Sequence, residues 1–215
     1  MNLANGSFPF VHCFIPSAGL QNQPPILCLQ GIDRKECDPL SIGLTIAPGA
    51  PLLSLCGQDR DGSASCSPPR PPDGVFEETD LRRRANDLAV FVAEARARYR
   101  LAQPIALGFS SGATVAAALL LLHPNLLAGA ILIHPVQSLT QLSQQTLFGT
   151  PVLLLSGAAD TIASPAVATA LALTLRDQGA MTTEKVVDGG HDLSVSDLSL
   201  AYGWMRQNIC FNAGL

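Results

Sequence analysis

The chain has 215 residues, of which 47% are hydrophobic and only 14% are charged. Its 13 Lys and Arg residues are outnumbered by 17 Asp and Glu residues, and a net charge of -4 lacks the basic excess that binding to nucleic-acid phosphates requires. We therefore expect no nucleic-acid partner. The longest apolar run, residues 113–122, is far shorter than the roughly 20 residues of a membrane-spanning helix, so no such helix is expected.

The N-terminus and the cysteines indicate the compartment. Residues 1–6 contain no Lys or Arg and lead into no signal-peptide pattern, so we expect a cytoplasmic protein. The six cysteines are Cys13, Cys28, Cys37, Cys56, Cys66 and Cys210. Because they lack the Cys-x-x-Cys spacing of zinc sites, we expect mostly buried, reduced thiols and no metal. Length and composition predict one domain, residues 1–215.

Seven short apolar runs have the composition of β-strands. In chain order they are residues 10–15, 26–30, 51–56, 105–109, 129–134, 152–156 and 181–187. Residues 130–133 and 152–155 are apolar at successive positions, which is typical of strands covered by helices on both faces.

Helical patterns fill the gaps between the strands. They cover residues 80–99, 111–123, 164–178 and 193–207. The first is expected to begin with Thr79 as N-cap and Asp80 in its first turn. Residues 57–73, rich in Gly, Ser, Asp and Pro, are expected to form a long surface loop. The alternation of strands and helices predicts an α/β protein, a three-layer α/β/α sandwich around a mostly parallel sheet.

A Gly-x-Ser-x-Gly motif, Gly-Phe-Ser-Ser-Gly, occupies residues 108–112. An apolar strand leads into it and a helix rich in Ala and Leu leads out, which is the context of a nucleophile elbow. Glycine at positions 108 and 112 would let the strand and the helix pass closely on either side of Ser110. We interpret Ser110 as a catalytic nucleophile, and the alternative is an inert serine in a tight turn.

A serine nucleophile needs a histidine base and an acid that orients it, in the chain order Ser, Asp, His. Asp160 follows the strand at 152–156, at a carboxyl strand end where catalytic loops gather. Its alternative role is that of a turn or helix-capping aspartate. His191 follows the last strand and two glycines, which indicate a loop close to another backbone. Asp160 and His191 are therefore the candidate acid and base.

The other histidines fit the pattern less well. His12 lies within the first predicted strand and His123 at a helix end. His134 ends a strand near the edge of the sheet where the candidate residues are expected. It precedes Asp160 in the chain, however, and so breaks the expected order. We expect His134 to be a helix- or loop-capping imidazole. The three arginines at 82–84 indicate a solvated helix face rather than an anion site.

Six short motifs occur together in the chain. They are Ala-Pro-Gly-Ala at 47–50, Gly-Val-Phe-Glu at 74–77, Asp-Leu-Arg-Arg-Arg at 80–84, the serine motif extended to 113, Leu-Leu-His-Pro at 121–124 and Gly-Gly-His at 189–191. Through them residues 26 to 207 resemble the bacterial phospholipase/carboxylesterase group of serine α/β-hydrolases, related to acyl-protein thioesterases. The resemblance implies an α/β-hydrolase fold without a lid domain, with Ser110 as nucleophile, Asp160 as acid and His191 as base.

The resemblance also indicates an oxyanion hole. Where the group usually has His-Gly-x-Gly, this chain has Gln30, Gly31, Ile32 and Asp33. The backbone N–H groups of Ile32 and Ser111 would then face the oxyanion. Because Asp33 replaces a glycine, a second interpretation stays open, a non-catalytic hydrolase-fold binding protein with an impaired oxyanion hole. The loop at 66–72 also departs from the group, so substrate preference does not transfer.

We expect a serine carboxylic-ester hydrolase that acts on small soluble esters or thioesters through an acyl-enzyme, without a cofactor. An amide hydrolase would use the same residues. Only 16 residues, 135–150, separate two predicted strands where many lipases insert a lid. An open site that favours short or medium acyl chains is therefore expected. The oligomeric state stays open, a homodimer being one alternative.

Overall fold

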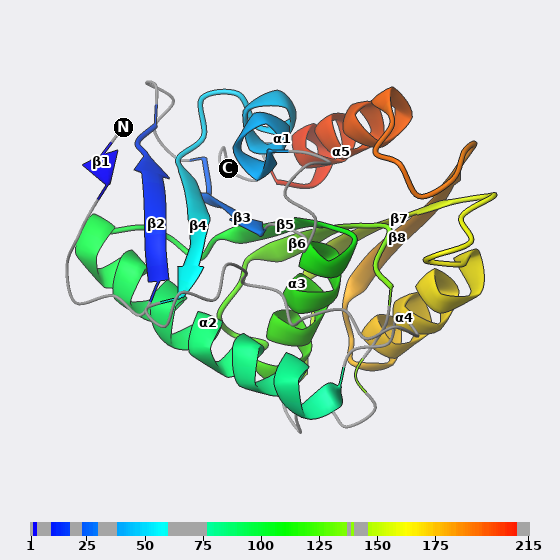
Figure 1. Cartoon of the computed structure of the whole chain (residues 1–215), viewed down its shortest axis with the longest axis horizontal. Helices are drawn as coiled ribbons and strands as arrows, with labels where there is room; N and C mark the ends of the chain where they lie inside the picture. Colours follow the sequence, from blue (N-terminus) through cyan, green and yellow to red (C-terminus); the bar gives the residue numbers. More distant parts are fainter. Residues whose placement is uncertain are drawn as a thin grey trace.

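The computed structural model describes residues 2–3, 10–17, 23–29, 38–59, 77–136, 139 and 146–209. An eight-stranded sheet with the order β1-β2-β4-β3-β5-β6-β7-β8 runs through its centre (Figure 1). The strands are β1 (Asn2–Leu3), β2 (Phe10–Ile15), β3 (Ile26–Leu29), β4 (Leu52–Asp59), β5 (Ile105–Phe109), β6 (Gly129–Ile133), β7 (Pro151–Gly157) and β8 (Met181–Val187). Strands β3 to β8 pair in parallel, while β1 and β2 are antiparallel at one edge. The expected mostly parallel sheet is confirmed.

Helices cover both faces of this sheet. They are α1 (Pro39–Ile46), α2 (Glu78–Tyr99), α3 (Ser111–Leu122), α4 (Pro165–Asp177) and α5 (Val195–Asn208). Figure 1 shows α2, α3 and α4 on one face and α1 with α5 on the other. The predicted three-layer α/β/α sandwich is confirmed.

Two buried hydrophobic clusters join the helices to the sheet. Phe91 of α2 and Leu119 of α3 belong to one cluster, and Trp204 of α5 belongs to the other. Successive residues of β6 alternate between them, since Ile131 faces the cluster of α5 and Leu132 the cluster of α3. Apolar residues at consecutive positions are therefore needed in this strand, because both of its faces are covered.

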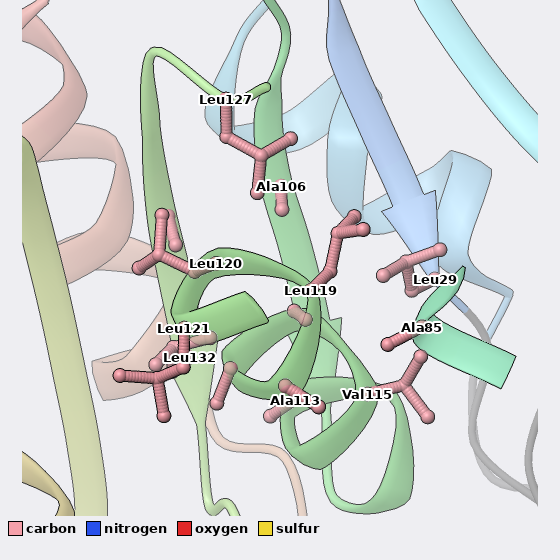
Figure 2. Close-up of a cluster of buried hydrophobic side chains, with 14 of the residues drawn as sticks. Leu29, Ala85, Ala106, Ala113, Val115, Leu119, Leu120, Leu121, Leu127 and Leu132 are labelled. Carbon is pink, nitrogen blue, oxygen red and sulfur yellow. The ribbon is translucent and has the colours of Figure 1, made fainter. Parts of the chain in front are cut away.

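Helix α3 is the most deeply buried of the described helices. Its residues from Ser111 to Leu121 are all buried. Figure 2 shows Leu119, Leu120 and Leu121 on different sides of the helix, among apolar side chains of neighbouring elements. Because α3 directly follows Ser110, this packing fixes the place of that serine relative to the sheet.

The start of α2 differs from the sequence prediction. Its N-cap is Glu77 rather than Thr79, and no side chain caps it. The first turn instead carries Glu78, whose carboxylate accepts a hydrogen bond from Arg82 one turn later at 2.8 Å, and Asp80. Acidic groups in the first turn interact favourably with the positive end of the helix dipole, which supports this earlier start.

Two other helix starts are set by caps. The sequence patterns did not indicate α1, which begins after Asp38, where Oδ1 accepts the Leu40 N–H at 3.1 Å. Helix α5 begins at Val195 rather than at residue 193, because Ser194 and Asp197 form a reciprocal capping box. Short polar caps of this kind decide where a helix begins more strongly than the apolar pattern does.

Strand β4 continues to Asp59, so the predicted start of the loop at residue 57 is too early. Residues 60–73 lie outside the described part of the chain.

Cys13 and Cys28 are free and buried. Burial raises the pKa of the Cys28 thiol, with a further contribution from the charge of Asp38. The other four cysteine side chains lie outside the described residues. Among the described helices, none is both long and apolar enough to cross a membrane.

Candidate active site

Four neighbouring parallel strands, β5 to β8, end at one edge of the sheet. The loops that follow them carry Ser110, His134, Asp160 and His191. Since the carboxyl ends of parallel strands meet at the same edge, these side chains come together although they are far apart in the sequence. The sequence prediction that strand ends gather the candidate residues is therefore met by the fold.

Ser110 occupies a sharp turn between β5 and α3. Its φ of 54° and ψ of -120° are costly for a residue with a side chain. The turn is held by hydrogen bonds from the Ser110 N–H to the Ile133 carbonyl at 2.8 Å and from the Thr114 N–H to the Ser110 carbonyl at 3.1 Å. A Cβ atom at Gly108 would collide with the backbone of Gly112, so the predicted need for glycine at position 108 is confirmed.

A chain of hydrogen bonds links Ser110, His191 and Asp160. The Ser110 Oγ lies 2.8 Å from the His191 Nε2, and the His191 Nδ1 lies 2.8 Å from the Asp160 Oδ2. With Nδ1–H donating to a carboxylate, Nε2 is left as the acceptor for the serine hydroxyl. The three candidate residues predicted from the sequence therefore lie in the geometry that proton transfer from serine to histidine requires.

Asp160 divides its two carboxylate oxygens between two tasks. Oδ1 accepts the N–H groups of Ile162 at 2.8 Å and Ala163 at 2.7 Å, as a turn-capping aspartate does. Oδ2 faces His191. Burial alone would raise the pKa of Asp160, but the hydrogen bonds from Ala163, His191, His134 and Ile162 outweigh it and lower that pKa. Asp160 therefore makes the contacts of a turn-capping aspartate and also faces His191, as the candidate acid must.

The loop that carries His191 lies against the end of β7. Gly189 has a φ of 133°, which requires glycine, and its carbonyl accepts the Ala159 N–H at 2.8 Å. A Cβ atom at Gly157 would collide with the carbonyl oxygen of Gly190. The close backbone approach expected from the two glycines is present, but the residue that must lack a side chain for it is Gly157.

The structure contradicts the interpretation of His134 as a capping imidazole. Its side chain is fully buried, and its Nδ1 lies 2.9 Å from the same Asp160 Oδ2 that faces His191. Its Nε2 lies 3.3 Å from the Asp197 Oδ1, while the Asp197 Oδ2 serves the α5 capping box. The Ser-x-x-Asp pattern at 194–197 is the sequence signal that places Asp197, but no motif connects it to His134.

Comparisons with known proteins identify the family of the chain. The chain is 33% identical over 186 residues to "Putative hydrolase MhqD" of Bacillus subtilis, a match that covers 86% of this chain and 93% of the relative. The chain belongs to the phospholipase/carboxylesterase family of α/β-hydrolases. This membership places it in the hydrolase class of enzymes. No protein-family model matches the sequence.

Solved structures give the same family. The carboxylesterase of Bacillus cereus has a TM-score of 0.83 at 28% identity, over 93% of this chain and 95% of that chain. The carboxylesterase of Mesorhizobium loti has a TM-score of 0.83 at 26% identity, over 95% and 98% of the two chains. SOBER1 of Arabidopsis thaliana, at 18% identity and a TM-score of 0.71 over 87% and 99%, shares the fold.

The remaining predicted positions of this α/β-hydrolase are only partly described. Ser111 is the buried first residue of α3, directly after the candidate nucleophile. Ile32, the other expected oxyanion donor, lies outside the described residues, as do Gln30 and Asp33. The helix N-terminus at Ser111 carries a partial positive charge beside Ser110, which is favourable for an anion formed there.

His12 and His123, which fit the expected pattern less well, have hydrogen-bond partners away from the candidate site. The His12 Nε2 lies 2.8 Å from the Tyr99 hydroxyl, and the His123 Nε2 lies 2.9 Å from the Asn86 Oδ1. Neither contact involves the residues at the strand ends. Of the three arginines at 82–84, Arg83 is exposed and pairs with Asp80 at 3.3 Å, as a solvated helix face predicts, whereas Arg82 and Arg84 are half-buried.

His134, Asp160 and His191 also have the spacing of a metal-binding group, with one ligand atom from each within 4.8 Å of the others. The Nδ1 atoms of His134 and His191 lie at hydrogen-bond distance from the Asp160 Oδ2, at 2.9 and 2.8 Å. Hydrogen bonding therefore accounts for this cluster.

Proposed function

We propose that this protein is a serine carboxylesterase that hydrolyses small soluble esters or thioesters through an acyl-enzyme on Ser110. The observation that carries the proposal is the 2.8 Å contact between the Ser110 Oγ and the His191 Nε2, on a histidine whose other nitrogen faces a carboxylate. A serine hydroxyl becomes an effective nucleophile when such a base accepts its proton. The carboxylesterases of similar structure support the ester as the substrate class.

The reaction follows from the roles of the three side chains. The Ser110 Oγ attacks the ester carbonyl while its proton passes to the His191 Nε2, and the new C–O bond gives a tetrahedral anion. When the anion collapses, the bond to the alcohol or thiol breaks and His191 returns the proton to that leaving group. Water then attacks the acyl carbon while its proton passes to the His191 Nε2, and the bond from that carbon to the Ser110 Oγ breaks as His191 returns the proton to the serine. Asp160 holds neutral His191 in the tautomer that accepts a proton and stabilises the imidazolium that forms.

The tetrahedral anion needs donors beside Ser110. The Ser111 N–H at the start of α3 and the Ile32 N–H are the donors that we assign to it. One such donor is worth about 3–4 kcal/mol of transition-state stabilisation, so both are required for efficient turnover. Asp33 next to Ile32 can adopt the left-handed backbone that a glycine would take there, more readily than most residues.

An open site favours small substrates. Between β6 and β7, the described residues 134–136, 139 and 146–150 contain no helix that could act as a lid. A site without a lid buries little of an acyl chain, and each buried CH₂ contributes only about 0.8 kcal/mol. Short or medium acyl esters are therefore the proposed substrates rather than emulsified long-chain lipids.

The proposal is tested by turnover of a panel of chromogenic esters, thioesters and anilides by the wild type and by Asp33→Gly. We expect ester hydrolysis by both proteins at similar rates, and slow or no hydrolysis of the anilides. A wild type that is inactive, together with an Asp33→Gly variant that gains several orders of magnitude, would instead identify a binding protein with an impaired oxyanion hole.

A further inference from the structure

His134 has a carboxylate oxygen opposite each of its ring nitrogens. The Asp160 Oδ2 lies 2.9 Å from Nδ1, and the Asp197 Oδ1 lies 3.3 Å from Nε2. An imidazole carries protons on both nitrogens only in its cationic form, and an ionised carboxylate only accepts hydrogen bonds. Two facing acceptors therefore call for a doubly protonated His134 ring.

The other oxygen of each carboxylate is already occupied by donors. The Asp160 Oδ1 accepts two backbone N–H groups, and the Asp197 Oδ2 accepts the Ser194 N–H at 2.8 Å and the Ser194 hydroxyl at 2.7 Å. Carboxylates that accept several hydrogen bonds are stabilised in their ionised form. Both aspartates should therefore stay negative, which leaves His134 as the group that carries the proton.

The side chains of His134, Asp160 and Asp197 have no solvent exposure, so their charges must compensate one another. Burial would lower the pKa of His134, but hydrogen bonds to Asp197 and Asp160 outweigh burial and raise that pKa. For Asp197 the directions are reversed: burial would raise its pKa, but hydrogen bonds from His134 and Ser194 outweigh burial and lower that pKa. The geometry and the charges agree on a cation between two anions.

The backbone also shows that His134 is held in place. Its φ of 52° lies in the left-handed region, which is costly for a residue with a side chain. The His134 N–H donates to the Leu155 carbonyl at 2.8 Å, which fixes this turn against β7. Strain of this kind persists only where the surroundings enforce it, and here it brings the ring between the two carboxylates.

We propose that His134 is a positioning residue, a permanently protonated imidazolium between Asp160 and Asp197 that keeps the Asp160 carboxylate ionised and aimed at His191. Its role in catalysis rests on the proposed function, because it acts through the acid of that reaction. One oxygen, Asp160 Oδ2, receives hydrogen bonds from both histidines, so rotation of the carboxylate away from His191 would also break its bond to His134.

His134 lies close to His191 as well as to the two aspartates. The imidazole rings of His134 and His191 are 5.7 Å apart between centroids, and the titratable groups that face His134 are Asp160, Asp197 and His191. The uncharged ring of Phe109 is 5.8 Å from the His134 ring.

The first test measures the proton on His134 directly, by ¹⁵N NMR of histidine-labelled wild-type protein between pH 6 and 8. The signals are assigned by their loss in His134→Gln. We expect both ring nitrogens of His134 to be protonated throughout this range, and in Asp197→Asn we expect deprotonation to move to lower pH. A neutral His134 tautomer in the wild type would overturn the proposal, whether or not the protein turns over esters.

The second test compares kcat and KM in His134→Gln and in the control His123→Gln, which removes a histidine that contacts Asn86 instead. We expect His134→Gln to lower kcat with little change in KM, because the Asp160 carboxylate loses a hydrogen bond that aims it at His191. The control should match the wild type. A kcat that is unchanged in a folded His134→Gln protein would show that His134 has a packing role only.

These outcomes are separable from the proposed function. If Ser110→Ala retains full turnover, the proposed reaction fails, while the NMR result on His134 stands by itself. If Ser110→Ala is inactive but His134 is neutral, the reaction stands and the positioning role fails.

Discussion

The carbonyl oxygen of Gly190 occupies the space that a Cβ atom on Gly157 would need. Gly157 ends β7 just before the loop of Asp160, and Gly190 directly precedes His191. The Ala158 N–H reinforces this contact by donating a hydrogen bond to the carbonyl oxygen of Val187, the last residue of β8, at 2.8 Å. Backbone packing between two loops therefore sets the distance between the proposed acid and base.

Replacing Gly157 by Ala should displace the His191 loop, because the obstacle is backbone rather than a flexible side chain. A shift of about 1 Å in a catalytic group can lower activity by roughly 100-fold, and we expect a loss of this size in kcat/KM. The matched control is Gly203→Ala in α5, where no atom crowds the added methyl. The control should keep full activity and gain about 0.5–1 kcal/mol in helix stability. Equal activity in the two variants would contradict the account.

Asp160→Asn should lower kcat by about 10⁴-fold while the fold is kept. The amide can still accept the N–H groups of Ile162 and Ala163 with its oxygen, but it would then present an NH₂ group to His191 and favour the wrong tautomer. The rate is compared with that of Asp38→Asn, the same change at the N-cap of α1. Wild-type turnover in Asp160→Asn would rule out Asp160 as the acid.

The stability of the protein should fall between about pH 6.5 and pH 8. The pKa of His134 is raised from 6.5, because its hydrogen bonds to two aspartates outweigh burial. In this range the native state holds a proton that the unfolded chain has lost, so the free energy of unfolding decreases as pH rises. Asp160 and Asp197 have lowered pKa values, so their contribution is present above pH 3.8 and is lost as pH falls below it.

Urea unfolding across this range measures the slope. His134→Gln should flatten it, whereas His123→Gln should retain it, because burial lowers the pKa of His123 and its contribution is lost only as pH falls below 6.5. The series stops at about pH 8, since the raised pKa of Cys28 adds a further loss above its ordinary value of 9.0. A slope that is unchanged in His134→Gln would assign the alkaline loss to another group.

Turnover should decrease for long acyl chains and show no activation at a lipid–water interface. The reason is the absence of a helical lid in the described part of the segment between β6 and β7. Rates are measured with p-nitrophenyl esters of increasing chain length, below and above the concentration at which the longest ester forms micelles. A sharp increase above that concentration would show that a closing element covers the site.

Much of the fold and of the site follows from the sequence for identifiable reasons. Apolar runs such as Ile131 to Ile133 mark strands buried on both faces, and their order with the helices predicts the parallel sheet. The turn at Ser110 is visible because its glycines are needed sterically, and the order of Asp160 and His191 follows from the strand ends. These features are local, or they follow from the rule that parallel strands end together.

The features that sequence did not predict depend on contacts across the fold. His134 and Asp197 are 63 positions apart, and each fits an ordinary local role, a strand-end residue and a capping aspartate. Helix α1 is short, and its start depends on the Asp38 cap rather than on a long apolar pattern. The close packing at Gly157 likewise depends on the position of a loop from another strand. None of these leaves a periodic pattern in the chain.

The most direct test of the central claim is a mass measurement on the protein quenched during turnover of a slowly deacylated ester. We predict that the intact mass rises by the mass of the acyl group, that the acyl group is found on the peptide that contains Ser110, and that Ser110→Ala shows neither acylation nor turnover. Acylation of another residue, or ester turnover by Ser110→Ala at the wild-type rate, would contradict the account.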